Sequence, residues 1–254
     1  MRNETLEFRK EGPIAVITFN LDSVERRDPF LIDSRFGDIC AEISSDPKIQ
    51  VVVITGVGDN LFGSGAPEGY MQTDGGGIYI PSIVESAAGL EIPVIIGMHG
   101  YIAGRSLELA LACDIRIATV QSQFALPQVG MGFLPFEGGT QRLPRIVGTA
   151  KALEMILTGE KIDAKTGYQI GLVNRIVNPD ELSAAIMTLA QEMSASSAIS
   201  LRYTKEAILK GMELTLEQGL RLEADLYFLM HTTGDRQEGI RAFREKRKPK
   251  FKGT

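Results

Sequence analysis

The chain has 254 residues, enough for one large domain, or one domain with a helical appendage, around a substantial buried core. Hydrophobic residues make up 44% and charged residues 23%, a balance that excludes a disordered or fibrous chain. The net charge of −5 supplies no overall field for nucleic acid, and no uninterrupted apolar run reaches the roughly 18 residues that a membrane span requires.

Short β-branched apolar runs predict strands in the first half of the chain, and apolar residues at helical spacing predict the helices between them. The predicted strands cover residues 14–19, 51–55, 94–96 and 115–118, and the predicted helices cover 31–44 and 106–113. Strands and helices therefore alternate, which indicates an α/β fold.

The last hundred residues are predicted to be mostly helical. From about Lys151 onward, Gly159 and Gly171 stand where helices would end, and Asp163 and Asp180 stand where helices would begin. We therefore expect a helical region to follow the alternating part of the chain.

Several common motifs fail. The segment Gly56–Leu61 lacks the third glycine of a dinucleotide-binding fingerprint, and Gly104–Glu108 begins like a nucleophile elbow but lacks its closing glycine. The two histidines and two cysteines are too far apart for a recognisable metal site, so no metal is expected. Because Cys40 and Cys113 are too few for a disulfide framework and no signal segment is recognisable, we expect a reducing, cytoplasmic setting.

The segment from Ile92 to Gly148 carries a long and specific pattern. It contains a strand, then GYIAGRSLELALACDIRIA over residues 100–118, then GGTQRLPR over residues 138–145. This pattern resembles the crotonase superfamily, also called the enoyl-CoA hydratase/isomerase family. Weaker similarity continues to the end of the chain. The resemblance implies a crotonase-type superhelix of repeated β-β-α units with a C-terminal helical region.

The resemblance also implies how the chain is divided into two functional regions. Residues 1–195 would form the core with the oxyanion hole and the active site, and residues 196–254 would form a helical region for trimerisation and contact with coenzyme A. The protein would assemble as a homotrimer or a dimer of trimers. It would bind neither nucleic acid nor membrane, and it would need no cofactor beyond the coenzyme A of its substrate.

A glycine-rich turn precedes the helix that starts near Arg105. The first N–H groups of a helix point at whatever occupies such a turn, so they could bind a ligand there. Amides there would stabilise the oxygen of a thioester enolate, at about 3 kcal/mol per donor. Carried over from the family, the oxyanion-hole donors would be the backbone amides of Ala66 and Arg105. The loop holding Ala66 is otherwise a plain flexible loop by composition.

Three side chains are candidates for proton transfer. Glu108 is either on a solvated stripe of its helix or buried with a raised pKa, and it matches the family's first catalytic glutamate. Gln128 stands where the family's hydratases carry a second glutamate, and an amide cannot transfer the proton. Glu137, in a loop where the family usually has a small residue, either supplies the missing acid or is an ordinary surface carboxylate.

The resemblance implies an enzyme that passes an acyl-CoA through an enolate, most simply an enoyl-CoA or dienoyl-CoA hydratase. The alternatives are a double-bond isomerase, a hydrolase of the carbon–carbon bond of a β-dicarbonyl, and a non-catalytic CoA-binding or scaffold relative. The side chain of Arg105, where the family often has glycine, could point to solvent, pair with Glu137 or bind a substrate carboxylate.

The terminal cluster of lysines and arginines is either a solvated tail or part of the coenzyme A site, the use to which the family puts this region. The expected CoA-binding residues are Arg26, Ser64, Gly65, Ala66, Lys246, Lys248 and Phe251. His99 and His231 are read as structural.

Overall fold

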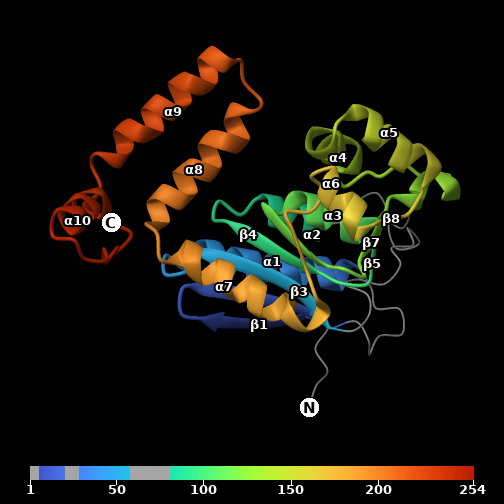
Figure 1. Cartoon of the computed structure of the whole chain (residues 1–254), viewed down its shortest axis with the longest axis horizontal. Helices are drawn as coiled ribbons and strands as arrows, with labels where there is room; N and C mark the ends of the chain where they lie inside the picture. The colour runs from blue at the N-terminus through green and yellow to red at the C-terminus, as the bar shows by residue number, and fades with distance from the viewer. Residues whose placement is uncertain (1–5, 21–28, 58–80) are drawn as a thin grey trace.

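The computed structural model describes residues 6–20, 29–57 and 81–254 (Figure 1). Its main sheet has six strands in the order β1-β2-β3-β4-β6-β9. The strands are β1 (Leu6–Glu11), β2 (Ile14–Asn20), β3 (Val51–Val57), β4 (Val94–Met98), β6 (Ile115–Thr119) and β9 (Arg175–Val177). Strands β1 and β2 form an antiparallel hairpin, and the other neighbours pair in parallel.

A second sheet of three short strands lies beside the first. It is formed by β5 (Tyr101–Ala103), β7 (Gln123–Ala125) and β8 (Ile162–Asp163), in that order. The successive strands β4 and β5 precede one helix, and β6 and β7 precede the next, so each repeat contributes one strand to each sheet. This arrangement confirms the α/β class and fits the repeated β-β-α units expected from the sequence.

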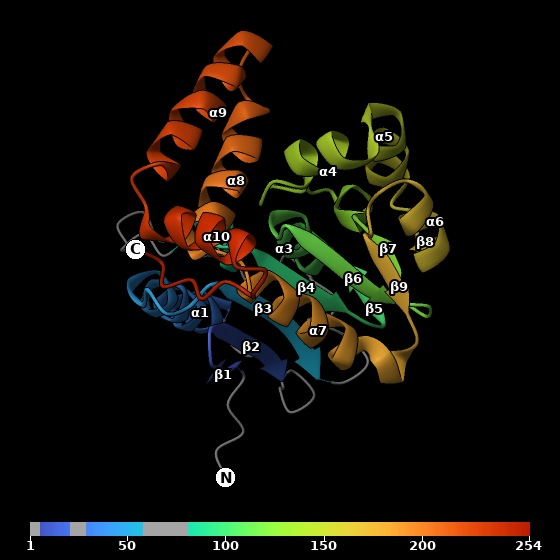
Figure 2. The ribbon, with the colours of Figure 1, turned by 60° about the vertical axis from the view of Figure 1, so that its left-hand side comes forward.

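The main sheet is covered on both faces because its strands are apolar on both faces. Alternate residues such as Ala15, Ile17 and Val52 pack in one hydrophobic cluster with α1 (Pro29–Ser45), α2 (Ile83–Ala88) and α3 (Arg105–Ala112). The residues between them, including Val16 and Val53, pack against α7 (Leu182–Ser194), which crosses the opposite face (Figure 2). A parallel sheet with both faces buried is the usual solution for such strands.

Helical segments make up most of the rest of the chain. They are η2 (Pro127–Met131), α4 (Gly139–Val147), α5 (Thr149–Thr158), α6 (Ala164–Gln169), η3 (Pro179–Glu181), α8 (Ala198–Gly211), α9 (Leu216–Met230) and α10 (Gly234–Arg244). Figure 1 shows α8 and α9 as a pair that extends away from the sheet, with α10 and the C-terminus beside its base. None of the helices in the described part of the chain is long and apolar enough to cross a membrane.

The predicted helix boundaries are confirmed at most positions. Gly159 caps α5 in the left-handed region at φ 65°, Gly171 follows α6 at φ 79°, and Asp163 caps α6 by accepting a hydrogen bond from the amide of Thr166. The prediction for Asp180 was wrong, since it lies inside η3. The N-cap there is Asn178, which forms a reciprocal capping box with Glu181.

One buried arginine fastens α3 to the neighbouring repeat. Arg116, on β6, donates from Nε to the carbonyl of Leu172 at 2.8 Å and from Nη1 to the carbonyl of Cys113 at 2.6 Å. The carbonyl of Cys113 follows the last turn of α3, and Leu172 precedes β9. The side chain therefore satisfies two buried carbonyls that no other hydrogen bond in the described residues is shown to reach.

We expect Arg116→Met to lower the free energy of unfolding by about 3 kcal/mol, because a buried carbonyl left without a donor costs on the order of 1–3 kcal/mol. Urea unfolding at pH 7 measures the effect, with Arg175→Met, an exposed arginine on β9, as the matched control. A loss below about 0.5 kcal/mol, typical of surface substitutions, would contradict this role.

Candidate active site

The start of α3 is shaped by a glycine. Strand β5 leads into Gly104, whose backbone lies at φ 56° and ψ −124°, a combination that a side chain would strain. The amide of Gly104 donates to the carbonyl of Ala125 at 3.1 Å, and α3 begins at the next residue, Arg105. The amide of Arg105 thus belongs to the first helical turn, whose N–H groups have no acceptor within the helix itself. Ala66, the other predicted donor, lies outside the described residues.

Glu108 is buried in the first turn of α3, and only 2% of its surface is exposed. Its Oε1 accepts hydrogen bonds from the backbone amides of Glu137 and Gly139, both at 2.9 Å. Its Oε2 accepts one from Nε2 of Gln128 at 3.1 Å. Of the two readings left open by the sequence, the buried carboxyl is therefore the one found. The side chains of Glu108 and Gln128 and the backbone amide of Glu137 therefore meet at one point.

The environment of Glu108 raises the pKa of its carboxyl towards neutral pH. Burial raises the pKa of the carboxyl from 4.5 to about 7, with the charge of Glu137 acting in the same direction. The hydrogen bond from the amide of Gly139 opposes the rise. A carboxyl with a pKa near the working pH can both give and take a proton, which is the property of a general acid or base.

The pair Gly138-Gly139 leaves room for this carboxyl. A Cβ atom on Gly139 would lie 3.0 Å from Oε1 of Glu108 and 2.8 Å from the Cβ of Pro135. Gly138 has a φ of +103°, which favours glycine, and its Cβ would collide with the guanidinium of Arg142. Gly139, the first residue of α4, is therefore required by close contact with Glu108, and Gly138, which caps the helix, is required by its backbone conformation.

Gln128 contributes a donor and an acceptor. Its side chain is buried on η2, and its Nε2 donates to Glu108. Its Oε1 is buried, and no described residue donates to it. Buried acceptors of this kind are uncommon in native structures unless water or a ligand satisfies them.

The side chain of Arg105 pairs with Glu137, one of the three choices left open by the sequence. Its Nε donates to Oε2 of Glu137 at 3.0 Å, and the two side chains are only 15% and 5% exposed. Glu137 is thus a buried member of the site rather than a surface carboxylate. Burial raises its pKa, and the charge of Arg105 opposes the rise. Arg142 holds the backbone of Glu137 by donating to its carbonyl at 2.9 Å.

Asp33 is a member of this cluster that the sequence reading missed. It lies on α1, is buried, and accepts hydrogen bonds from Nη2 of Arg105 and from the amide of Ile83, the latter at 3.1 Å. One signal was available in the sequence. Asp33 stands three, seven and ten residues before Phe36, Cys40 and Ile43, all of which are buried, so it is an acid on the apolar face of its helix.

The described part of the predicted coenzyme A site lies elsewhere. Lys246, Lys248 and Phe251 follow α10, and Figure 1 shows this tail well separated from α3 within the chain. The other predicted CoA residues, Arg26, Ser64, Gly65 and Ala66, are outside the described residues.

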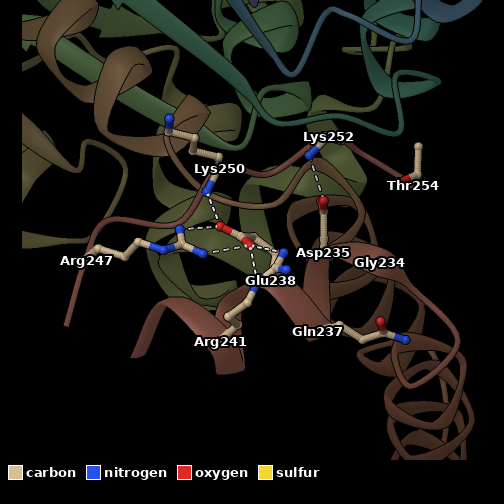
Figure 3. Close-up of a pocket in the computed structure, with 9 residues that line it drawn as sticks. All are labelled: Gly234, Asp235, Gln237, Glu238, Arg241, Arg247, Lys250, Lys252 and Thr254. Atoms are coloured by element: carbon tan, nitrogen blue, oxygen red, sulfur yellow. Dashed lines mark hydrogen bonds and ion pairs between the residues drawn. The ribbon is translucent and has the colours of Figure 1, made fainter. Parts of the chain in front are cut away.

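The terminal tail and α10 together line an open pocket of about 710 Å³ (Figure 3). Glu238 accepts hydrogen bonds from Arg247, from the amide of Lys250 and from Arg241, which hold the pKa of its carboxyl well below the usual range. The backbone amide of Lys252 donates to Asp235 at 2.7 Å. The tail is therefore anchored to α10 rather than freely solvated.

The two histidines and the two cysteines have surroundings of their own. Nε2 of His99 lies 3.2 Å from the carbonyl of Gly56, and the ring of His231 packs on Tyr227 and Phe228. Burial raises the pKa of both cysteine thiols to about 12. Among the described residues, no group of three or more histidine, cysteine or acidic side chains could hold a metal ion.

Comparison with known proteins identifies the family. The enoyl-CoA hydratase/isomerase family model matches residues 33–254. The chain is 34% identical to a crotonyl-CoA hydratase of Syntrophomonas wolfei, over 99% of both chains. It is also 34% identical to a short-chain-enoyl-CoA hydratase of Clostridium acetobutylicum, over 98% of this chain and 97% of the relative.

Solved structures agree. The crystal structure of an enoyl-CoA hydratase from Bacillus anthracis matches 99% of this chain and 100% of its own, with a TM-score of 0.89 and 30% identity. The chain therefore belongs to the enoyl-CoA hydratase/isomerase family and is an enzyme of that family. The family and the crotonase-type fold expected from the segment 92–148 are confirmed.

The raised pKa of Glu108 predicts how stability depends on pH. The carboxyl ionises near pH 4.5 when unfolded and near 7 when folded, so its burial lowers stability as the pH rises through this window. We expect Glu108→Gln, which has no charge to bury, to gain about 3 kcal/mol relative to the original chain between pH 4 and pH 8.

Urea unfolding of both proteins across this pH range measures the difference. Glu160→Gln, which changes an exposed glutamate, is the matched control and should run parallel to the original chain. A Glu108→Gln curve that also runs parallel would show that Glu108 titrates as an ordinary surface carboxyl.

Proposed function

We propose that this enzyme adds water across the double bond of an enoyl-CoA or dienoyl-CoA thioester, through an enolate, with Glu108 and Glu137 as its two acid/base groups. The observation that carries the proposal is that Glu137 adjoins Glu108: the backbone amide of Glu137 donates to Oε1 of Glu108 at 2.9 Å, and the charge of the Glu137 carboxyl raises the pKa of Glu108. Hydration requires a proton to leave water and a proton to reach the α-carbon, so it needs two proton transfers. The names of the relatives support the same reaction.

Glu108 is proposed to give up and take back one of these two protons, because its pKa lies near neutral pH. Gln128 is assigned the positioning of Glu108 rather than proton transfer. Its Nε2 donates to the carboxylate form of Glu108, and a half-turn of the amide would place Oε1 there to accept from the acid form. An amide at position 128 therefore suits Glu108 in both states.

Glu137 is assigned the role that the glutamate replaced by Gln128 would have had. Its Oε2 is paired with Arg105, while its Oε1 is buried and receives no hydrogen bond from the described residues. That oxygen is a candidate acceptor for the attacking water. The backbone amides of Arg105 and Ala66 are proposed to hold the thioester oxygen.

Coenzyme A binding and assembly are further parts of the proposal. Arg26, Ser64, Gly65, Ala66, Lys246, Lys248 and Phe251 are proposed to contact coenzyme A, which enters as part of the substrate, and no other cofactor is proposed. Because the terminal tail lies apart from α3 within the chain, we propose that it serves the site of a neighbouring subunit in a homotrimer or dimer of trimers.

The helical region supports assembly. Large apolar side chains on α8, on α9 and between them are exposed, among them Ile208, Met212, Leu216, Leu220 and Phe228. Exposed apolar surface of this kind marks an interaction site. Residues 196–254 are therefore proposed as the unit of trimerisation and CoA contact, beside a core of residues 1–195. A cytoplasmic location stays a prediction.

Double-bond isomerisation is the second candidate, and the amide at position 128 favours it. Moving a double bond needs proton transfers but no water, so a Gln128 that binds Glu108 directly is compatible with it. Cleavage of a β-dicarbonyl has no separate support among the described residues.

Incubation with a panel of acyl-CoA thioesters in heavy water separates these reactions. Products are followed by mass: added water with deuterium at the α-carbon reports hydration, whereas deuterium alone, with a shifted double bond, reports isomerisation. Absence of any product from enoyl-CoA, dienoyl-CoA and β-dicarbonyl thioesters would overturn the proposal.

We expect Glu108→Gln and Glu137→Gln each to lower turnover by about 10²- to 10⁴-fold, because each removes a positioned proton carrier and keeps its shape. Affinity for coenzyme A should stay nearly unchanged, since neither side chain is assigned to it. Initial rates on the best substrate, with Glu160→Gln as the exposed control, measure the effect. Full activity in the Glu108 variant would refute its assignment. Full activity in the Glu137 variant alone would refute the role of Glu137 and leave Glu108 as the single working carboxyl.

For the tail, we expect the double substitution Lys246→Ala and Lys248→Ala to weaken acyl-CoA binding, because both charges are exposed and would face phosphates. Arg247 is left in place because it is bound to Glu238 and anchors the tail. Calorimetric titration at low and high salt measures the loss, which should shrink as salt screens the charges. The control replaces two exposed lysines elsewhere, Lys48 and Lys165, by alanine. Equal affinity in both double variants would remove the tail from the site.

A further inference from the structure

Asp33 is a buried acid that nothing in the proposed reaction yet uses. It lies 72 residues before Arg105 in the chain, on α1, and its side chain is almost completely buried. Its Oδ1 accepts two hydrogen bonds, one from the guanidinium of Arg105 and one, at 3.1 Å, from the amide of Ile83 at the start of α2. A buried carboxylate costs free energy unless it is paired and hydrogen-bonded, and this one is both.

The guanidinium of Arg105 joins two carboxylates. Its Nη2 donates to Asp33, and its Nε donates to Glu137 at 3.0 Å. The guanidinium is planar, and its donors stand in a rigid fork. Holding one end of the fork therefore sets the direction of the other, so the position of Asp33 determines how Arg105 meets Glu137.

We propose that Asp33 is a positioning residue of the active site, which acts through Arg105 to orient the carboxylate of Glu137. The inference rests on the proposed function, in particular on Glu137 as the second acid/base group. It extends the site to α1 and to the start of α2, two elements that supply no group to the reaction itself.

The charges around Glu137 determine the direction in which its pKa should change when Asp33 is replaced. Among the described residues, Arg105 from α3, Asp33 from α1 and the hydroxyl of Ser82 before α2 act on its carboxyl. The charged groups of Glu108 and Arg142 contact its backbone. Arg105 lowers the pKa of Glu137, and the charge of Asp33 raises it. Asp33 and Glu137 share one cation, so removing the charge of Asp33 leaves Arg105 to Glu137 alone. The pKa of Glu137 should then fall.

The direct test follows Glu137 without substrate. In protein labelled with ¹³C at glutamate side-chain carboxyls, the resonance lost in Glu137→Gln is that of Glu137, and its titration is compared between the original chain and Asp33→Asn. Asparagine keeps the size of the side chain and an acceptor for the amide of Ile83. The expected result is a lower pKa in Asp33→Asn, by about one unit or less.

Two further variants control this test. Asp38→Asn removes an exposed acid from the same helix and should leave the titration of Glu137 unchanged. Asp33→Glu keeps the charge and should leave the pKa closer to its original value than Asp33→Asn does. It also serves as the second variant if Asp33→Asn does not fold, in which case retention of the original pKa supports the charge effect and a fall refutes it.

The kinetic test uses a short-chain enoyl-CoA. Asp33→Asn should lower kcat by about 10- to 100-fold with little change in KM, because it misplaces a proton carrier and removes no substrate contact. The limb of the pH profile that disappears in Glu137→Gln should move to lower pH. Original kcat and an unmoved limb would overturn the proposal.

The two tests separate two kinds of failure. An unchanged pKa of Glu137 in a folded Asp33→Asn refutes the positioning role whether or not the enzyme hydrates any substrate. Absence of hydration in the original chain refutes the proposed function, while the titration still decides whether Asp33 acts on Glu137.

Discussion

The burial of one carboxyl group, that of Glu108, is the constraint on which the rest of the site depends. An isolated carboxylate inside a protein is costly, and its cost falls only when donors surround it. Three donors do so here, and they come from two segments that follow α3 in the chain: η2, and the loop that leads into the first residue of α4. The glycine at 139 is needed because its amide must come this close. Much of the conformation of residues 127–139 thus follows from the need to surround Glu108.

The site holds more acid than base. Asp33 and Glu137 both pair with the side chain of Arg105, whereas Glu108 accepts hydrogen bonds from Gln128 and from two backbone amides. Burial raises the pKa of Glu108 to about 7, and the charge of Glu137 acts in the same direction. The raised pKa of Glu108 therefore reflects a neighbouring carboxyl as well as its own burial. The same reasoning disfavours Arg105 as a receptor for a substrate carboxylate, since two buried acids already share it.

Features of the site that depend on residues close together in the sequence could be predicted, whereas features that depend on distant segments could not. The helix bearing Glu108 follows from apolar spacing and a glycine turn, and Gln128 and Glu137 lie within thirty residues of it in a pattern specific to the family. The direction of Arg105 could not be predicted, because it depends on Asp33, which a distant helix brings to it. Asp180 failed as a cap for a smaller reason: Asn178 and Glu181 form a better reciprocal pair around the same turn.

In the proposed assignment, Gln128 stands where the family's hydratases carry a glutamate, and Glu137 supplies a carboxyl from the next loop instead. The surroundings of this carboxyl differ, because it is paired with the side chain of Arg105. In the proposed mechanism Arg105 would then act twice, with its amide on the thioester oxygen and its guanidinium on Glu137. Negative charge that develops on the thioester oxygen would be stabilised by the positive charge of Arg105. A proton that moves from water to Glu137 would neutralise Glu137 and weaken its ion pair with Arg105. The two events would therefore be coupled through one residue, and Asp33 would keep that residue in place throughout.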